Sequence, residues 1–213
     1  MENFKDLGVQ GDIIKGINEL GILVPTDIQK QVIPALLENQ IDLIGHAQTG
    51  TGKTAAYGLP LIQKIDPKLN QIQGLVLCPT RELGQQVAKQ LFKFTKYTDK
   101  IFVESVYGGA QIDKQINALK RTTHIVVATP GRLIDLMKRN AIDISNVRTV
   151  VLDEADEMLS MGFKKELNEI LDTLSRVDCK WLFSATMPDG IKQIVNQHLS
   201  KDALRIEISG KNV

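Results

Sequence analysis

One short glycine-rich run, Ala47-Gln48-Thr49-Gly50-Thr51-Gly52-Lys53-Thr54, limits the possible folds of this chain more than any other segment. An apolar run at 41–44 precedes it, and an Ala-rich stretch of helical character follows it. A strand, a tight turn and a helix in this order direct backbone N–H groups and the positive end of the helix dipole at one point, which suits phosphates. Lys53 is expected to reach the outer phosphates, and the Thr54 hydroxyl to hold Mg²⁺. The sequence predicts a nucleotide-binding loop; the alternative is a turn without a ligand.

The remaining sequence alternates short β-branched runs with helical patterns, which is typical of a parallel sheet covered on both faces. The candidate strands are 41–44, 74–78, 101–106, 124–128, 148–152, 180–183 and 204–208. Helical stretches between them include 81–96, 113–120 and 164–174. The 213 residues suit a single domain. We expect an α/β fold with a mostly parallel, twisted sheet of about seven strands.

A polar loop follows each candidate strand except the last. The carboxyl ends of parallel strands meet at one edge of a sheet, and ligands bind in the crevice there. Six loops are therefore expected to share one edge: the 47–54 run, Pro79-Thr80-Arg81-Glu82-Leu83, Gly108-Gly109, Thr129-Pro130-Gly131-Arg132, Asp153-Glu154-Ala155-Asp156 and Ser184-Ala185-Thr186. So many polar loops indicate a site larger than a nucleotide alone.

Two adjacent carboxylates, Asp153 and Glu154, follow the apolar strand at 148–152. A carboxylate at the strand tip can hold Mg²⁺ opposite Thr54, partly through water, and its neighbour can orient the attacking water. Lys53, Asp153 and Glu154 are therefore the predicted catalytic residues. In the alternative, the two acidic groups only favour the start of the next helix through its dipole.

Composition limits the classes of protein that fit. Apolar residues make up 43% of the chain and charged residues 24%, as in globular domains. No apolar stretch approaches the roughly 18 residues that span a bilayer, and the first residues lack the apolar centre of a signal peptide. Cys78 and Cys179 are far apart, which favours buried thiols in a cytoplasmic protein. A net charge of +1 means that any contact with nucleic acid must be local.

Taken in order along the chain, these motifs resemble the first RecA-like domain of DEAD-box ATP-dependent RNA helicases. The resemblance runs from Phe4 to about Ile208. At position 47 the general phosphate-loop (Walker A) pattern has Gly, whereas the family has Ala, as this chain does. One small departure is Gly84, where the family more often has Ala. The resemblance implies a RecA-like P-loop domain over 1–208, with ATP and Mg²⁺ as cofactors and RNA as partner.

The same resemblance implies an adenine-reading element within 1–29, made of Phe4, Pro25, Thr26 and Gln29. The Gln29 amide can pair with a donor and an acceptor on adenine, which guanine presents the other way round. From the residues alone an equally good alternative exists, because Thr26-Asp27-Ile28-Gln29 is a capping box that begins a helix.

For RNA, the resemblance assigns backbone contacts to Pro79, Thr80, Arg81, Gly108, Gly109, Thr129, Pro130, Gly131 and Arg132. Exposed N–H groups, hydroxyls and two guanidinium groups suit sugar-phosphate oxygens and position a strand without reading its sequence. The alternatives are local: Thr129-Pro130 can begin a helix, and Gly108-Gly109 can form a permissive turn. The preference for RNA over DNA rests on the resemblance alone.

The resemblance also implies that Ser184 and Thr186 couple the nucleotide site to strand separation by contacting Asp156. The alternative is that Ser184 or Thr186 caps the helix that follows Pro188.

The sequence contains no candidate for the arginine that such phosphoryl transfer usually needs. In the resembled family it lies on a second RecA-like domain, so 209–213 is interpreted as the start of an interdomain linker with that domain absent. We expect an isolated, monomeric domain that binds nucleotide but hydrolyses it very slowly and does not unwind RNA. A nucleotide- and RNA-binding module without turnover and another P-loop NTPase, such as a small-molecule kinase, remain as alternatives.

Overall fold

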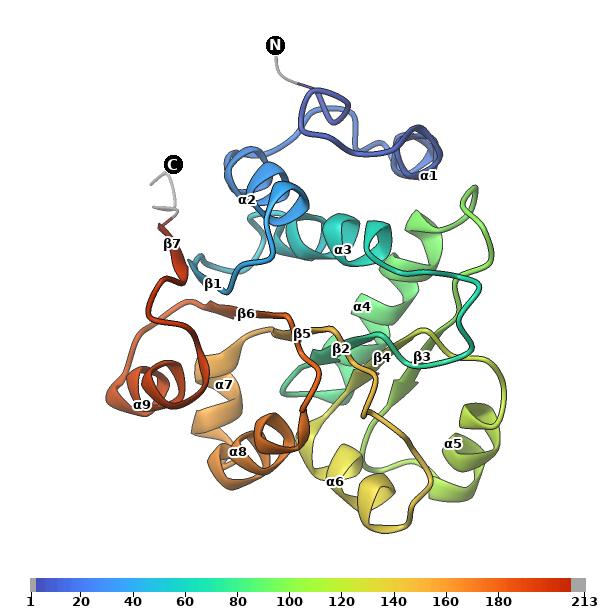
Figure 1. Cartoon of the computed structure of the whole chain (residues 1–213), viewed down its shortest axis with the longest axis vertical. Helices are drawn as coiled ribbons and strands as arrows, with labels where there is room; N and C mark the ends of the chain where they lie inside the picture. The colour runs from blue at the N-terminus through green and yellow to red at the C-terminus, as the bar shows by residue number, and fades with distance from the viewer. Residues whose placement is uncertain (1–2, 208–213) are drawn as a thin grey trace.

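The computed structural model describes residues 3–207 and shows an α/β sandwich of three layers (Figure 1). All seven described strands are parallel, in the order β3-β4-β2-β5-β6-β1-β7. The strands are β1 (Leu43–His46), β2 (Gly74–Leu77), β3 (Val103–Val106), β4 (Ile125–Ala128), β5 (Thr149–Leu152), β6 (Cys179–Ser184) and β7 (Leu204–Glu207). The helices are α1 (Gly11–Glu19), α2 (Asp27–Glu38), α3 (Lys53–Gln63), α4 (Arg81–Phe94), α5 (Ile112–Leu119), α6 (Pro130–Lys138), α7 (Ala155–Ser160), α8 (Lys164–Thr173) and α9 (Asp189–His198). The fold class predicted from the sequence is confirmed.

Each face of the sheet carries its own hydrophobic core. Successive side chains of a strand point to opposite faces, and β2 shows this directly: Val76 joins the core beneath α1 to α4, whereas Leu75 and Leu77 join the core beneath α6 to α9. The two groups of helices lie on opposite sides of the sheet in Figure 1. Burial on both faces explains why the strands read as continuous apolar runs rather than as an alternation of apolar and polar residues.

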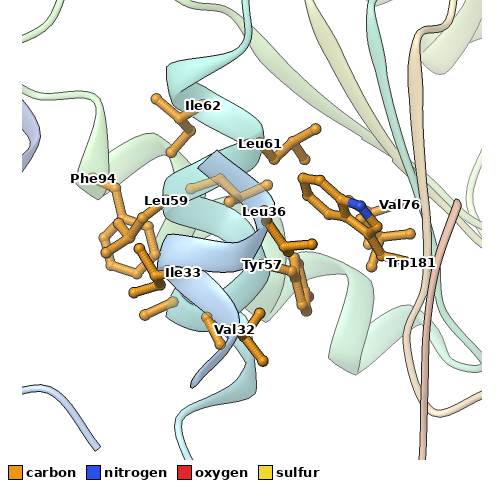
Figure 2. Packing of buried hydrophobic residues seen from close by; sticks show 14 of the residues in the cluster. Val32, Ile33, Leu36, Tyr57, Leu59, Leu61, Ile62, Val76, Phe94 and Trp181 are labelled. Carbon is orange, nitrogen blue, oxygen red and sulfur yellow. The ribbon is translucent and has the colours of Figure 1, made fainter. Parts of the chain in front are cut away.

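Helix α3 packs between α2 and the sheet. Figure 2 shows Tyr57 and Leu61 on the side of this helix that faces Val76 and Trp181. All four side chains are completely buried. The packing fixes the rotation of α3 about its axis, and therefore also the direction of Lys53 and Thr54 at its first turn.

The strand bounds differ from expectation by one to two residues at several ends. The largest shifts are at the starts of β1 and β3, which begin at Leu43 and Val103 rather than at residues 41 and 101. Asp42 stands outside the strand because its buried carboxylate accepts hydrogen bonds from the backbone N–H groups of Lys180 (2.8 Å) and Ser200 (2.7 Å). Strand β6 extends to Ser184, so the Ser-Ala-Thr motif begins inside the strand. The predicted end of the last strand at residue 208 and the predicted linker at 209–213 lie outside the described residues.

Both cysteines are free and buried, as expected. Of the helices that the structure describes, none has the length and hydropathy needed to cross a membrane.

Candidate nucleotide and nucleic-acid site

The six polar loops lie at one edge of the sheet because every strand that precedes them runs in the same direction (Figure 1). The phosphate loop connects β1 to α3 there. Gly50 and Gly52 have φ angles of 78° and 89°, a left-handed conformation that favours glycine. Ala47 is buried, and its N–H donates to the Ser184 carbonyl (3.2 Å), which ties the loop to β6. Gln48, Thr49 and Gly50 are exposed and leave the outer side of the loop open.

The Thr26–Gln29 segment supports the phosphate loop from the side. The capping box is present: the Thr26 N–H donates to Oε1 of Gln29 (3.0 Å), and Gln29 is the third residue of α2. The same two side chains also reach the loop, because Thr26 donates to the Thr51 carbonyl (3.0 Å) and Nε2 of Gln29 to the Gly52 carbonyl (3.1 Å). A Cβ atom on Gly52 would lie 2.6 Å from Nε2 of Gln29. The left-handed φ of Gly52 favours glycine here, and a side chain would also displace the Gln29 amide.

The segment expected to read adenine is therefore placed beside the loop, with both ends of the Gln29 amide already hydrogen-bonded. Thr26 is exposed and Gln29 buried, and both line the cavity described below. Phe4 and Pro25 are buried, and Phe4 belongs to the core beneath α1 to α4.

Beneath the loop lies a buried polar cluster formed by Lys53, Asp153 and Tyr57. Nζ of Lys53 is 3.5 Å from Oδ1 of Asp153, and both side chains are less than 10% exposed. The Tyr57 hydroxyl donates to Oδ2 of Asp153 (2.8 Å). Within residues 3–207, Nζ of Lys53 and Oδ1 of Asp153 are two of only four buried side-chain atoms without a hydrogen-bond partner.

Unpaired buried polar groups are rare in folded proteins and call for an explanation. A phosphate oxygen would satisfy the ammonium of Lys53, and a metal ion or its bound water would satisfy the free oxygen of Asp153. Mg²⁺ usually takes one or two carboxylates together with substrate phosphates and waters. Asp153, with the partly exposed Thr54 at the start of α3, suits that kind of site.

Glu154 follows directly and takes an unusual backbone conformation. Its φ and ψ angles are 49° and 52°, in the left-handed region that a glutamate rarely adopts. Partial burial raises the pKa of the Glu154 carboxyl, and the charges of Asp153 and Asp156 add to the rise against the opposing charge of Lys53. Glu154 is the N-cap residue of α7 but makes no capping hydrogen bond with its side chain, so the alternative that its charge favours the helix start through the dipole stays open.

A cavity of about 480 Å³ joins these parts. Its walls come from the segment before α2, the phosphate loop, the exposed side of α4 and the start of α7. The lining residues that sequence analysis singled out are Thr26, Gln29, Thr49, Gly50, Gly52, Lys53, Thr54, Asp153 and Glu154. The volume lies within the range of small-molecule sites.

The loops expected to contact RNA lie along the same edge, beyond the cavity. Thr80 caps α4 by accepting from the Leu83 N–H (3.2 Å), and Pro130 is the first residue of α6 with Thr129 as its cap. Gly109 has a φ of 82° in the turn after β3, so both local alternatives, the helix start at Thr129-Pro130 and the turn at Gly108-Gly109, are present. The Gly108 N–H donates to Oγ1 of Thr129 (3.4 Å), which links two of the loops.

The two arginines of these loops differ in their surroundings. Arg81 is exposed, with its guanidinium 4.9 Å from the centre of the Tyr107 ring. Arg132 donates to Oε1 of Gln115 (2.9 Å) and to the Ala110 carbonyl (3.0 Å). In the described structure Arg132 thus holds the loop that carries Gly108 and Gly109. Pro79 is buried, whereas Gly109 and Gly131 are exposed.

Asp156, Ser184 and Thr186 form one hydrogen-bonded group between α7 and the end of β6. The Thr186 hydroxyl (2.8 Å) and N–H (3.1 Å) both donate to Oδ2 of Asp156, and the Asp156 N–H donates to Oγ of Ser184 (3.2 Å). Burial favours the neutral acid, but the hydrogen bonds from Thr186 and Ser184 outweigh it and lower the pKa of Asp156. The alternative capping role of Ser184 or Thr186 is wrong, because α9 begins at Asp189 with Pro188 as its cap.

Sequence analysis missed three residues of this edge: Tyr57, Tyr107 and Gln115. Tyr57 had a signal, because it stands four residues after Lys53 and so lies on the same helix face. Tyr107 stands directly before Gly108, and its contact with Arg81 depends on the folding of two separate loops. Gln115 carried no signal, since its contacts with Arg132 and with the Tyr107 backbone depend on the folding of two separate loops.

Comparison with known proteins agrees with this geometry. The family model described as DEAD/DEAH box helicase matches residues 26–194. The chain is 43% identical over 213 residues to the "DEAD-box ATP-dependent RNA helicase CshA" of Bacillus cereus, and 47% identical over 208 residues to the "ATP-dependent RNA helicase CshA" of Listeria monocytogenes. These alignments cover 100% and 97% of the chain, which spans about 40% of the length of either relative.

Two solved structures are also similar. A DEAD box protein from the hyperthermophile Methanococcus jannaschii superposes with a TM-score of 0.92 at 38% identity, over 97% of this chain and 56% of the other. A hypothetical ATP-dependent RNA helicase from Sulfolobus tokodaii gives a TM-score of 0.83 at 38% identity, over 92% of this chain and 56% of the other. With a family model that matches well over half of its residues, the chain belongs to the DEAD/DEAH box helicase family.

Proposed function

We propose that this chain is the ATP-binding first domain of an ATP-dependent RNA helicase. The observation that carries the proposal is the buried pair of Lys53 and Asp153, whose facing atoms lack hydrogen-bond partners within residues 3–207. The pair lines a cavity shared with the phosphate loop, the Thr26–Gln29 segment and Glu154. The names of the relatives, which are ATP-dependent RNA helicases, support the same assignment.

In this proposal the phosphate loop binds the triphosphate. The backbone N–H groups from Gly50 to Thr54 surround the phosphates at the start of α3, and Lys53 neutralises the outer phosphate charge. Thr26 and Gln29 keep the loop in shape, and Gln29 is placed to contact the base as well. The element from 1 to 29 would then both read adenine and brace the loop.

Hydrolysis needs charge neutralisation, an oriented nucleophile and in-line geometry. Mg²⁺, held by Thr54 and Asp153 partly through water, would supply part of the neutralisation when bound. Glu154 accepts the proton of the attacking water, and the raised pKa of its carboxyl makes it a better base than an exposed glutamate. Its position at the rim of the cavity supports this role.

RNA is proposed to bind along the loops that follow β2, β3 and β4. The exposed Arg81, Gly109 and Gly131 offer charge and N–H groups to sugar-phosphate oxygens, which suits binding without sequence preference. The group formed by Asp156, Ser184 and Thr186 joins the carboxylates of the nucleotide site to the end of β6, and we propose that it couples nucleotide turnover to local duplex unwinding.

A second RecA-like domain is proposed to complete the site. The relatives are more than twice as long as this chain, and the described residues place no arginine at the cavity. An arginine supplied from outside is worth about 10³- to 10⁵-fold in rate in related phosphoryl-transfer enzymes. We therefore expect this chain alone to bind nucleotide with very slow turnover.

The test is to measure ATP hydrolysis by this chain with and without single-stranded RNA, and again with the second domain of the CshA relative added in trans. RNA-stimulated turnover that appears only in the mixture is expected. A Glu154→Gln variant in the same mixture is the matched control: it should retain nucleotide binding and lose turnover by about 10²- to 10⁴-fold. RNA-stimulated turnover by the chain alone would contradict the split site, and phosphate transfer to a small acceptor would point to a kinase.

A further inference from the structure

Tyr57 lies in the core and carries a hydroxyl group that the packing of its ring does not explain. Its ring is completely buried and packs against Phe183, with 5.4 Å between the ring centres. The hydroxyl donates to Oδ2 of Asp153 (2.8 Å). A phenylalanine would fill the same space, so the ring accounts for the packing and the hydroxyl needs a separate explanation.

Tyr57 lies near both of the residues proposed to hold Mg²⁺. Its hydroxyl donates a hydrogen bond to one of them, Asp153. The other, Thr54, stands three residues before Tyr57 and so lies on the same face of α3.

The hydrogen bond distinguishes the two oxygens of Asp153. Oδ2 is occupied by Tyr57, whereas Oδ1 lies 3.5 Å from Nζ of Lys53 and, among the described residues, accepts no hydrogen bond. Without the hydrogen bond from Tyr57, the Asp153 carboxylate could rotate about its terminal torsion, which has a broad energy profile. Fixing one oxygen leaves the other directed at the lysine and the phosphate loop.

We propose that the Tyr57 hydroxyl is a positioning group for the magnesium site, which holds the Asp153 carboxylate so that Oδ1 is presented to the metal or to its bound water. This inference rests on the proposed function, since it assumes that Asp153 serves Mg²⁺. Partners that orient a metal ligand typically change metal affinity by about 10- to 100-fold when they are removed.

The test uses the Tyr57→Phe variant of this chain, which removes one oxygen and keeps the ring. Binding of a fluorescent ADP analogue is measured by titration over a range of Mg²⁺ concentrations and in EDTA. We expect the Mg²⁺ concentration for half-maximal enhancement of binding to rise by about 10-fold, with unchanged affinity in EDTA. Tyr97→Phe is the matched control, because the Tyr97 hydroxyl donates to Glu19 on the surface, away from the cavity.

Four results separate the possibilities. An unchanged Mg²⁺ requirement in Tyr57→Phe would overturn the inference, and so would an equal loss of nucleotide affinity with and without Mg²⁺, which indicates a packing defect. In an Asp153→Asn background, Tyr57→Phe should have no further effect on the Mg²⁺ requirement; an additive effect would also overturn it. If the unsubstituted chain binds nucleotide equally well in EDTA, the proposed magnesium site fails, and this inference fails with it.

Discussion

At the scale of single residues, the site contains polar groups that the fold alone does not satisfy. A buried charge is strongly destabilising unless it is paired and hydrogen-bonded. Lys53 and Asp153 are paired at 3.5 Å, yet neither facing atom has a hydrogen bond within residues 3–207. Under the proposed function, this arrangement serves ligand binding at the expense of stability, a trade-off that is common at functional sites.

Glu154 shows the same compromise in the backbone. A left-handed conformation costs an L-residue with a Cβ about 1–2 kcal/mol, and glycine adopts it freely. Only two non-glycine residues in the described chain have a positive φ: Glu154 at 49° and Asn140 at 53°. Asparagine tolerates this region comparatively well, so Glu154 is the strained position of the two.

We expect the Glu154→Gly variant to be more stable than Glu154→Ala by about 1 kcal/mol, because both lose the carboxylate and only alanine keeps the strained Cβ. Urea unfolding of the two variants measures the difference. The same pair of substitutions at Asn140 is the control and should give a similar gap. Equal stability of the glycine and alanine variants at position 154 would show that the backbone there is not strained.

At the scale of elements, close contacts decide where small residues are needed. Helix α1 begins with Gly11, around which a Cβ would meet nothing within 4 Å. Gly16 of the same helix faces the end of α4, and a Cβ there would lie 2.8 Å from the Phe94 carbonyl oxygen. The sequence shows two glycines in one helix, and only the packing distinguishes them.

Gly16→Ala should lower the free energy of unfolding by about 1–3 kcal/mol, because the added methyl group forces α1 away from the backbone of α4. Gly11→Ala should raise it by about 0.5 kcal/mol through the reduced entropy of the unfolded chain. Urea unfolding of both variants tests the pair. A stabilising Gly16→Ala substitution would mean that the two helices are not in close contact.

All seven strands and several helices could be predicted from their sequence patterns, but helix α1 and some bounds were not. Apolar runs and glycine-rich turns placed all seven strands, because period and turn chemistry are local properties. The start of β1 was misplaced because the carboxylate of Asp42 binds backbone groups near residues 180 and 200, far away in the sequence. The capping alternative for Ser184 and Thr186 failed for a similar reason, since Asp156 of a distant loop engages Thr186.

At the scale of the whole molecule, the sheet order brings distant segments together. β1 and β5 both neighbour β6, so the phosphate loop after β1 and the acidic motif after β5 lie on either side of the end of β6. A nucleotide in the cavity would contact α2, α3 and the start of α7 at once. Ligand binding should therefore stabilise the complete domain rather than one element.

At a concentration of 100 times its dissociation constant, Mg-ADP should add about 2.7 kcal/mol of stability and raise the unfolding midpoint by roughly 5–10 °C. Differential scanning fluorimetry measures this shift. If Gln29 reads adenine, Mg-GDP at the same concentration should give a smaller shift of the unfolding midpoint than Mg-ADP. The Gln29→Ala variant should then show a smaller difference between the two nucleotides. An unchanged preference in that variant would leave Gln29 with only its capping and bracing contacts.

The sequence by itself determined the class of fold and predicted the chemistry of the site. A phosphate loop between strand and helix, an acidic pair after an apolar strand and regular alternation of elements depend on neighbours within about ten residues, which local physics governs. Only the tertiary structure decided which atoms meet. The pairing of Lys53 with Asp153, the hydroxyl of Tyr57 on that carboxylate and the bracing of Gly52 by Gln29 all join segments more than 20 residues apart. Such contacts follow from the order of strands and the packing of helices, which no local pattern records.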